Sequence, residues 1–158
     1  MGFALSSMTL RSTSFEAGGA IADCHVKTGG NVSPQLSWTG APGEARSFAV
    51  ICHDPDAPLI SPGNYGFVHW VLYNIPAGTT GLAEGAEIGT PGRNDFGDRG
   101  WGGPQPPPGH GTHHYYFWLL ALDRETALEP GLGMWEFLAK VEPHVIAANR
   151  LVGTYRND

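Results

Sequence analysis

Apolar and polar side chains alternate, or apolar residues cluster, in several short runs of this chain. Residues 8–15 alternate with the two-residue period of a β-strand. Three longer runs, 46–53, 67–75 and 114–123, are rich in β-branched and aromatic residues, and 151–155 has the same character. These five runs predict strands.

The segments between the runs are rich in glycine and proline. The chain has 23 glycines and 13 prolines among 158 residues, and they follow no fixed period. This composition favours loops around short strands over a repetitive structure. Residues 16–45 and 76–112 are therefore predicted to be mostly loop, with short strands marked by Trp38 and Ile88.

Helical periodicity appears only late in the chain. Residues 134–141 place apolar side chains at positions i, i+3, i+4 and i+7, which predicts an amphipathic helix. Pro143 fits the first turn of a second short helix that includes residues 145–147. The whole pattern predicts a mainly β protein, a β-sandwich with a few short helices near the C-terminus, in one domain over 1–158.

Charge and hydropathy exclude several function classes. The net charge is −6, and Lys27 and Lys140 are the two lysines. A nucleic-acid-binding protein carries a basic patch, and the sequence shows none. No apolar run reaches the roughly 20 residues needed to span a bilayer, and no secretory signal pattern opens the chain. We therefore expect a cytoplasmic protein without integral membrane association.

Two cysteines, Cys24 and Cys52, leave the redox compartment open. Two cysteines are enough for one disulfide between them. The simpler interpretation is that both are free thiols in a reducing compartment. The sequence does not decide whether they pair.

Candidate chemistry lies where rigid loops meet apolar strands. The Pro/Gly loop 103–112 leads directly into a strand that begins with His113, His114 and Tyr115. Proline fixes φ, so such a loop holds one shape and favours a pocket at its junction with the strand. An earlier strand ends similarly at Asp54, and the next strand contains His69.

Strand alternation predicts which of these side chains point the same way. His113, Tyr115 and Phe117 fall on one face of their strand, and His114 falls on the other. By the same rule His69 should share a face with residues 67 and 71.

Each candidate also has a purely structural interpretation. A single histidine on an apolar strand is usually a core residue with one hydrogen bond. An aspartate before a proline turn usually caps backbone amides, which applies most strongly to Asp56 and also to Asp54. The pair His113 and Tyr115 would then be polar residues at a sheet edge.

A metal site or a hydrolase site has less support. His110, His113 and His114 with Asp54 have ligand types suited to zinc, but alternation sends His113 and His114 to opposite faces. The sequence also contains no Gly-x-Ser-x-Gly elbow and no Gly-rich dinucleotide or Walker loop. We predict neither a metal nor a cofactor.

An ordered set of motifs resembles the phosphatidylethanolamine-binding protein family, which includes the Raf kinase inhibitor proteins, and its bacterial branch in particular. The motifs cover nearly the whole chain: Asn31-x-Ser33-Pro34-x-Leu36-x-Trp38, Asp54-Pro55-Asp56-Ala57-Pro58, His69-Trp70 with Asn74-Ile75-Pro76, Asn94-Asp95-Phe96-Gly97, Gly103-Pro104 with Pro106-Pro107, His113-x-Tyr115, and Leu151-Val152-Gly153-Thr154-Tyr155.

The resemblance implies a large central antiparallel sheet flanked by a smaller one, and a pocket for a small anion or a phospholipid headgroup. Carried over to this chain, the ligand-binding residues it implies are Asp54, Pro58, His69, Pro107, His113 and Tyr115. The resemblance also implies a homodimer.

Three functions follow from these patterns. The first is a non-enzymatic protein that binds a small anion or a phosphatidylethanolamine-type headgroup. The second is a small-molecule enzyme, such as an isomerase, cyclase or hydrolase, that uses Asp54, His69, His113 and Tyr115 for acid–base chemistry. The third, by analogy with the family alone, is regulation of a protein kinase or protease.

Overall fold

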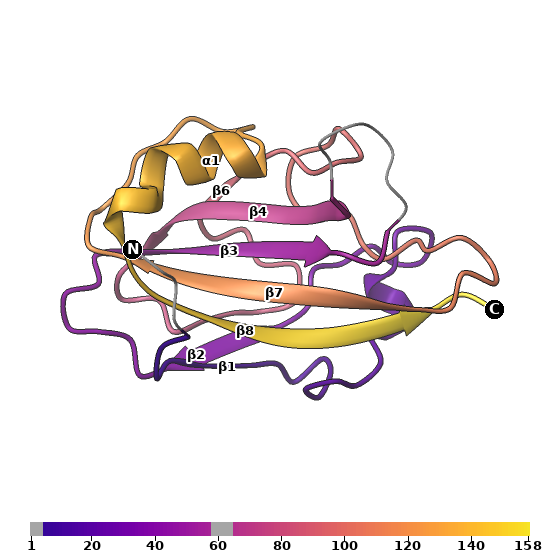
Figure 1. The fold of residues 1–158 in the computed structure, drawn as a ribbon. Coiled ribbons are helices and arrows are strands. Elements are labelled where there is room, and N and C mark those ends of the chain that lie inside the picture. Colours follow the sequence, from indigo (N-terminus) through magenta and orange to yellow (C-terminus); the bar gives the residue numbers. More distant parts are fainter. Residues whose placement is uncertain (1–4, 58–64) are drawn as a thin grey trace.

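Two antiparallel sheets and one short α-helix make up the fold (Figure 1). The computed structural model describes residues 5–57 and 65–158. A five-stranded sheet has the order β6-β4-β3-β7-β8, and a three-stranded sheet has the order β1-β2-β5. The elements are β1 (Thr9–Arg11), η1 (Asp23–His25), β2 (Leu36–Thr39), β3 (Ser47–Asp54), β4 (Phe67–Pro76), β5 (Gly81–Leu82), β6 (Thr90–Pro91), β7 (Thr112–Leu122), α1 (Met134–Val141), η2 (Glu142–His144) and β8 (Val145–Arg156).

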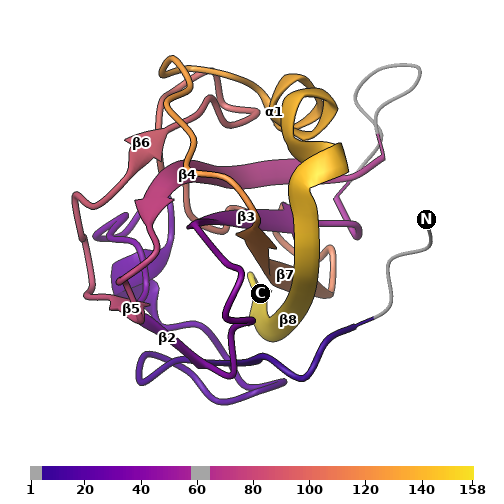
Figure 2. The ribbon, with the colours of Figure 1, turned by 90° about the vertical axis from the view of Figure 1, so that its left-hand side faces the viewer.

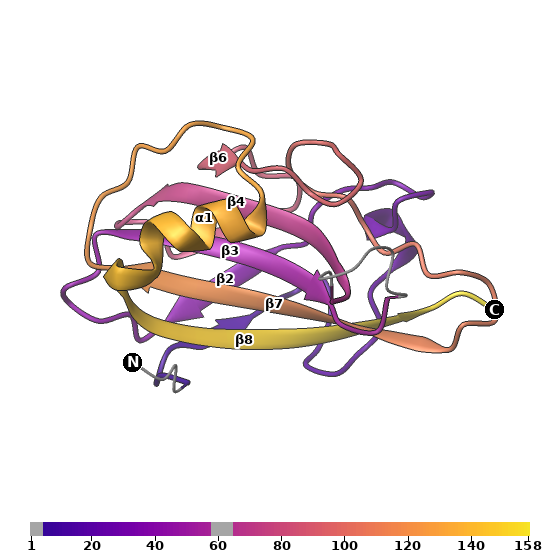
Figure 3. The same ribbon diagram turned by 45° about the horizontal axis from the view of Figure 1, so that its top comes forward.

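The five-stranded sheet lies in the middle of the molecule. The small sheet covers one face, and α1 lies across part of the other face (Figures 2 and 3). The core between the sheets contains Trp38 of β2 and Phe48 of β3, and the core beneath α1 contains Tyr73 of β4 and Phe137 of α1. Because β3 is covered on both faces, it is a continuous apolar run rather than an alternating one.

The main features of the sequence prediction are confirmed. The mainly β fold with a larger and a smaller antiparallel sheet is present. The runs 46–53, 67–75, 114–123 and 151–155 correspond to β3, β4, β7 and β8, with residues 46 and 123 just outside their strands, and the helix predicted over 134–141 is α1. The run 8–15 contains the shorter strand β1, because only Thr9–Arg11 pairs with β2.

Two local predictions are wrong. Pro143 lies in a single 3₁₀ turn, η2, and the predicted second helix does not continue because Val145 pairs with Leu122 and opens β8. The β-branched residues there fit a strand better than a helix. Ile88 is an exposed loop residue, and the short strand in that region is Thr90–Pro91, paired with β4.

Both cysteines are free thiols, Cys24 exposed and Cys52 buried in the core between the sheets. Over residues 5–57 and 65–158, no helix has the length and apolar character needed to cross a membrane.

Candidate functional site

A cavity of about 230 Å³ opens at one end of the five-stranded sheet. Asp54 ends β3, His69 lies near the start of β4, and His113 and Tyr115 lie near the start of β7. Because neighbouring strands are antiparallel, the end of β3 meets the beginnings of β4 and β7. The lining residues are Asp54, Ala57, Phe67, His69, Phe96, Gln105, Pro106, Pro107, His113 and Tyr115.

The cavity brings together five of the six residues that the family resemblance implied. Asp54, His69, Pro107, His113 and Tyr115 all line it. Pro58 lies outside the described residues. The alternation predicted for β7 is confirmed, because His113, Tyr115 and Phe117 are buried while His114 is exposed.

A β-bulge in β4 directs His69 toward this cavity. The pairing of β3 with β4 shifts between Cys52 and His53, which leaves His69 as the extra residue. Val71 packs in the core beneath α1, whereas His69 contacts Tyr115, which belongs to the core between the sheets. The prediction that His69 shares a face with Val71 is therefore wrong, because the bulge interrupts strict alternation.

His69 is buried among aromatic rings. Its side chain is 3% exposed, with ring centroids 4.8 Å from Phe67 and 5.2 Å from Tyr115. Its Nδ1 lies 2.6 Å from the carbonyl oxygen of Gly102 and donates to it. Burial lowers the pKa of His69 to about 4, although that hydrogen bond opposes the shift. The imidazole is therefore neutral near pH 7.

Asp54 and His113 form a buried pair at the floor. His113 Nδ1 lies 2.7 Å from Asp54 Oδ2, and Asp54 Oδ1 accepts from the backbone N–H of Asp56 at 2.8 Å. Burial raises the pKa of Asp54, and the hydrogen bond from His113 opposes this rise. The other ring nitrogen of His113, Nε2, lies 2.6 Å from Nδ1 of exposed His110, so both nitrogens of His113 are engaged.

Tyr115 places an unpartnered hydroxyl in the site. The side chain is 0% exposed, and its hydroxyl has no hydrogen-bond partner. Burial, with the nearby charge of Asp54, raises the pKa of Tyr115, so the phenol stays protonated. Three buried side-chain polar atoms lack partners among the described residues; the other two belong to Trp38 and Thr126, outside this cavity.

His114 faces away from the site. Its Nδ1 lies 2.7 Å from Asp56 Oδ2, and its backbone N–H donates to the same oxygen at 2.8 Å. His113 and His114 therefore lie on opposite faces of β7, which separates two of the residues considered as zinc ligands.

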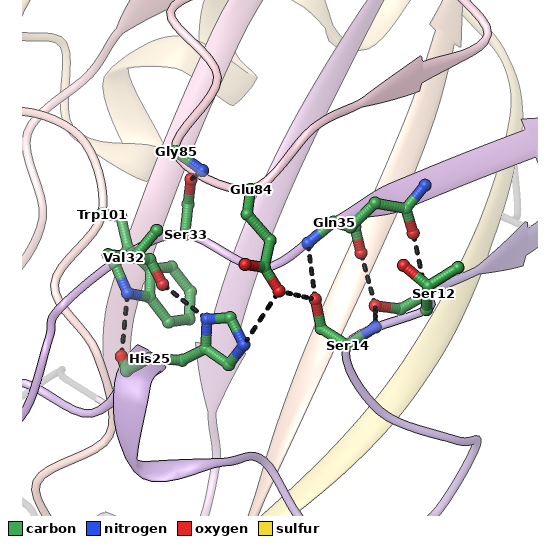
Figure 4. A network of polar contacts seen from close by, with 10 residues as sticks. Ser12, Ser14, His25, Val32, Ser33, Gln35, Glu84, Gly85 and Trp101 are labelled. Atoms are coloured by element: carbon green, nitrogen blue, oxygen red, sulfur yellow. Dashed lines mark hydrogen bonds and ion pairs between the residues drawn. The ribbon is translucent and has the colours of Figure 1, made fainter.

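A polar network beside the cavity wall was not predicted from the sequence (Figure 4). The indole N–H of Trp101 donates to the carbonyl oxygen of His25 at 3.0 Å. The buried His25 ring donates from Nδ1 to Val32 at 2.7 Å, and its Nε2 lies 3.6 Å from Glu84. Ser14 donates to the same Glu84 carboxylate at 2.8 Å. These residues are distant in sequence, and no local pattern marked them.

This network supports the loop that forms the cavity wall. The backbone N–H of Lys27 donates to Pro104 at 3.0 Å, and the N–H of Gly102 donates to the His69 carbonyl at 2.9 Å. At Gly103, a Cβ atom would lie 1.9 Å from the His25 carbonyl oxygen. Glycine is therefore required where the wall loop passes η1.

A second cavity, of about 190 Å³, lies between the start of β4 and α1. It contains none of the predicted site residues. Its lining residues include Arg93 and Glu136, whose charged groups pair with each other at 3.1 Å. The cavity at Tyr115 is the stronger candidate because it holds a buried polar group without a partner.

Comparison with known proteins agrees with the motif resemblance. The family model described as phosphatidylethanolamine-binding protein matches residues 11–156. A UPF0098 protein of Methanothermobacter thermautotrophicus is 42% identical over 156 residues, covering 94% of this chain and 99% of that protein.

Two solved structures share the fold closely. A phosphatidylethanolamine-binding protein homologue from Chlamydia trachomatis has a TM-score of 0.88 at 36% identity, covering 96% of this chain and 98% of that one. YbcL of Escherichia coli has a TM-score of 0.87 at 32% identity, covering 97% and 100%. The chain therefore belongs to the phosphatidylethanolamine-binding protein family.

Proposed function

We propose that this protein binds a small anion or a phosphorylated headgroup of the phosphatidylethanolamine type in the cavity lined by Asp54, His69, Pro107, His113 and Tyr115. The observation that carries the proposal is the Tyr115 hydroxyl, buried at the cavity without a partner. A buried polar group in this state costs free energy, and a ligand oxygen that accepts its hydrogen bond removes that cost.

The chemistry of the lining suits such a ligand. Phe67, Phe96 and Pro107 provide apolar walls for the carbon atoms of a headgroup. The Tyr115 hydroxyl donates to an oxyanion, and the buried carboxylate of Asp54 attracts an ammonium group. Phosphoethanolamine carries both groups on one small skeleton.

Substitution of Tyr115 separates a binding role from a structural one. Tyr115→Phe removes the donor, and we expect affinity for phosphoethanolamine to fall about tenfold, the effect of one hydrogen bond to a charged group. The same change removes an unsatisfied hydroxyl, so the free protein should be more stable by about 1 kcal/mol. Isothermal titration and urea unfolding measure the two effects.

The matched control is Tyr116→Phe, the next residue of β7, which faces away and lies beneath Arg150. We expect it to leave affinity unchanged. Equal binding by wild type and Tyr115→Phe, or no binding of phosphoethanolamine, phosphate or acetate by wild type, would overturn the proposal.

A specific observation also favours the second function, a small-molecule enzyme. Asp54, His113 and His110 form a continuous chain from a buried carboxylate to an exposed imidazole. Such a chain can carry a proton between the cavity and solvent. NMR spectra of phosphoethanolamine or related small esters, recorded over hours with the protein, test for turnover that His113→Ala should abolish.

The regulatory role toward a kinase or protease, the homodimer and the cytoplasmic location stay predictions from the family resemblance and the sequence. Light scattering tests the oligomeric state, and affinity capture with wild type and a pocket variant side by side tests for a partner that depends on the cavity.

A further inference from the structure

Two polar side chains of the cavity lining are candidates to contact a ligand: Tyr115, whose buried hydroxyl has no hydrogen-bond partner within the described part of the chain, and His69, whose ring bonds to Gly102 through Nδ1. Their roles follow from their neighbours. The Gly102 carbonyl only accepts hydrogen bonds, so His69 Nδ1 carries the ring proton. A neutral imidazole protonated at Nδ1 has a lone pair at Nε2. The site therefore offers one donor, Tyr115, and one acceptor, His69.

The other polar groups of the floor are already engaged. His113 uses both ring nitrogens, one on Asp54 and one on His110. Asp54 accepts at both oxygens, from His113 and from the backbone of Asp56. A ligand that leaves these bonds intact therefore meets no free imidazole N–H from His69 or His113.

The lining also lacks a fixed positive charge. The described lining residues include neither lysine nor arginine. Lys27 is not one of these lining residues; its Nζ lies 4.6 Å from the centroid of the Phe96 ring and 3.2 Å from a carboxylate oxygen of Asp98. A fully ionised oxyanion in the cavity would meet the Asp54 carboxylate and the His69 lone pair, with one hydroxyl to stabilise it.

We infer that the cavity binds an oxyanion together with one proton, which bridges His69 Nε2 and one ligand oxygen while a second ligand oxygen accepts from Tyr115. The ligand class is a singly protonated oxyacid, such as the monoanion of a phosphate monoester. This inference rests on the proposed anion-binding function and specifies which ionisation state of the ligand is bound.

The charged groups around His69 decide where the proton comes from. His53 on β3 and His113 on β7 both disfavour a positive charge on the His69 ring, and Asp54 lines the same cavity. Because burial is the larger effect and holds the pKa of His69 near 4, the free protein does not carry this proton at neutral pH. The ligand supplies it, since a phosphate monoester loses its second proton near pH 6.

The test compares two esters of the same shape. Phosphoethanolamine and its sulfate ester counterpart, O-sulfoethanolamine, share one skeleton, but the sulfate group has no proton to give at neutral pH. At pH 6 we expect wild type to bind phosphoethanolamine at least tenfold more tightly than O-sulfoethanolamine. Above pH 7 its affinity should fall about tenfold per pH unit, as the monoanion is depleted.

Calorimetry gives an independent readout. Titrations at pH 7.5 in buffers with different ionisation enthalpies should show uptake of about one proton per phosphoethanolamine bound, because the dianion predominates in solution. His69→Gln offers an amide N–H in place of the lone pair, so its preference between the two esters should fall below threefold. Tyr115→Phe, as the control, should weaken both esters equally and keep their ratio.

The outcomes distinguish failure of the proton-coupled binding mode from failure of the proposed anion-binding function. Equal affinity of wild type for the two esters at pH 6, or binding of phosphoethanolamine at pH 7.5 without proton uptake, overturns the proton-coupled mode and leaves the anion pocket standing. If wild type binds neither ester at pH 6, the proposed function falls with it.

Discussion

His69 shows how burial fixes the chemistry of one side chain. A histidine in an unfolded chain titrates near pH 6.5, whereas burial lowers the pKa of His69 in the folded protein to about 4. At pH values between these two pKa values, the His69 ring binds a proton in the unfolded chain but not in the folded protein. Stability is therefore unaffected above pH 6.5 and falls as the pH decreases toward 4.

This shift predicts an effect on acid stability. His69→Gln cannot titrate at this position, so its free energy of unfolding should fall less between pH 7 and pH 4.5 than that of wild type, by about 2 kcal/mol. Urea unfolding at both pH values measures the difference. Equal losses in the two proteins would mean that His69 titrates normally in the folded state.

The family resemblance pointed to five of the residues that line the cavity, but not to what each offers to a ligand. His113 and Tyr115 could be placed on one face because alternation in β7 is regular. The acceptor role of His69 depends on the carbonyl of Gly102, which lies in a different loop, and on the bulge in β4. Neither leaves a local pattern in the sequence.

Among the elements, the longer strands were predictable because their apolar runs are covered by other parts of the protein. Elements with a weaker sequence pattern take their conformation from pairing with a neighbouring strand. Residues 145–147 could extend a helix on local periodicity, and pairing with the end of β7 makes them strand instead. The loop 103–112 was predicted to be rigid from its prolines, but its hydrogen bonds to Lys27 and Asn31 involve partners far along the chain.

The anchoring of the wall loop can be tested at Gly103. A Cβ atom there would overlap the His25 carbonyl oxygen at 1.9 Å, so Gly103→Ala must displace the loop or η1. We expect a loss of about 1–3 kcal/mol in stability, as for overpacking elsewhere, and weaker binding of phosphoethanolamine. Urea unfolding and calorimetry report the two effects.

The matched control is Gly43→Ala, because a Cβ at Gly43 has no heavy atom within 4 Å and its φ is not positive. It should change neither stability nor affinity by more than a few tenths of a kcal/mol. Wild-type affinity in a folded Gly103→Ala protein would show that the loop tolerates displacement without altering the cavity.

At the scale of the whole molecule, one face of the five-stranded sheet packs against α1, and the cavity lies on the other face. The face beneath α1 carries an apolar core, where the fully buried Phe137 stacks on Tyr73 at 5.1 Å. The opposite face carries the core between the sheets, and the cavity lies at one end of it. With a net charge of −6, the protein as a whole does not attract anions over long distances, so recognition depends on the cavity itself.

Because the α1 core and the cavity lie on opposite faces of the sheet, we expect some substitutions to lower stability without changing affinity, and others to lower affinity with little effect on stability. Phe137→Ala removes a ring from the α1 core and should cost about 3–5 kcal/mol of stability, while the folded fraction keeps wild-type affinity for phosphoethanolamine. Phe96→Ala removes a half-buried ring from the cavity wall and should weaken binding several-fold at a smaller cost in stability. Urea unfolding and calorimetry below the unfolding transition give both values for each variant. If Phe137→Ala weakened binding as much as Phe96→Ala, the α1 face would be coupled to the cavity through the strands they share, and the two faces could not be treated as independent.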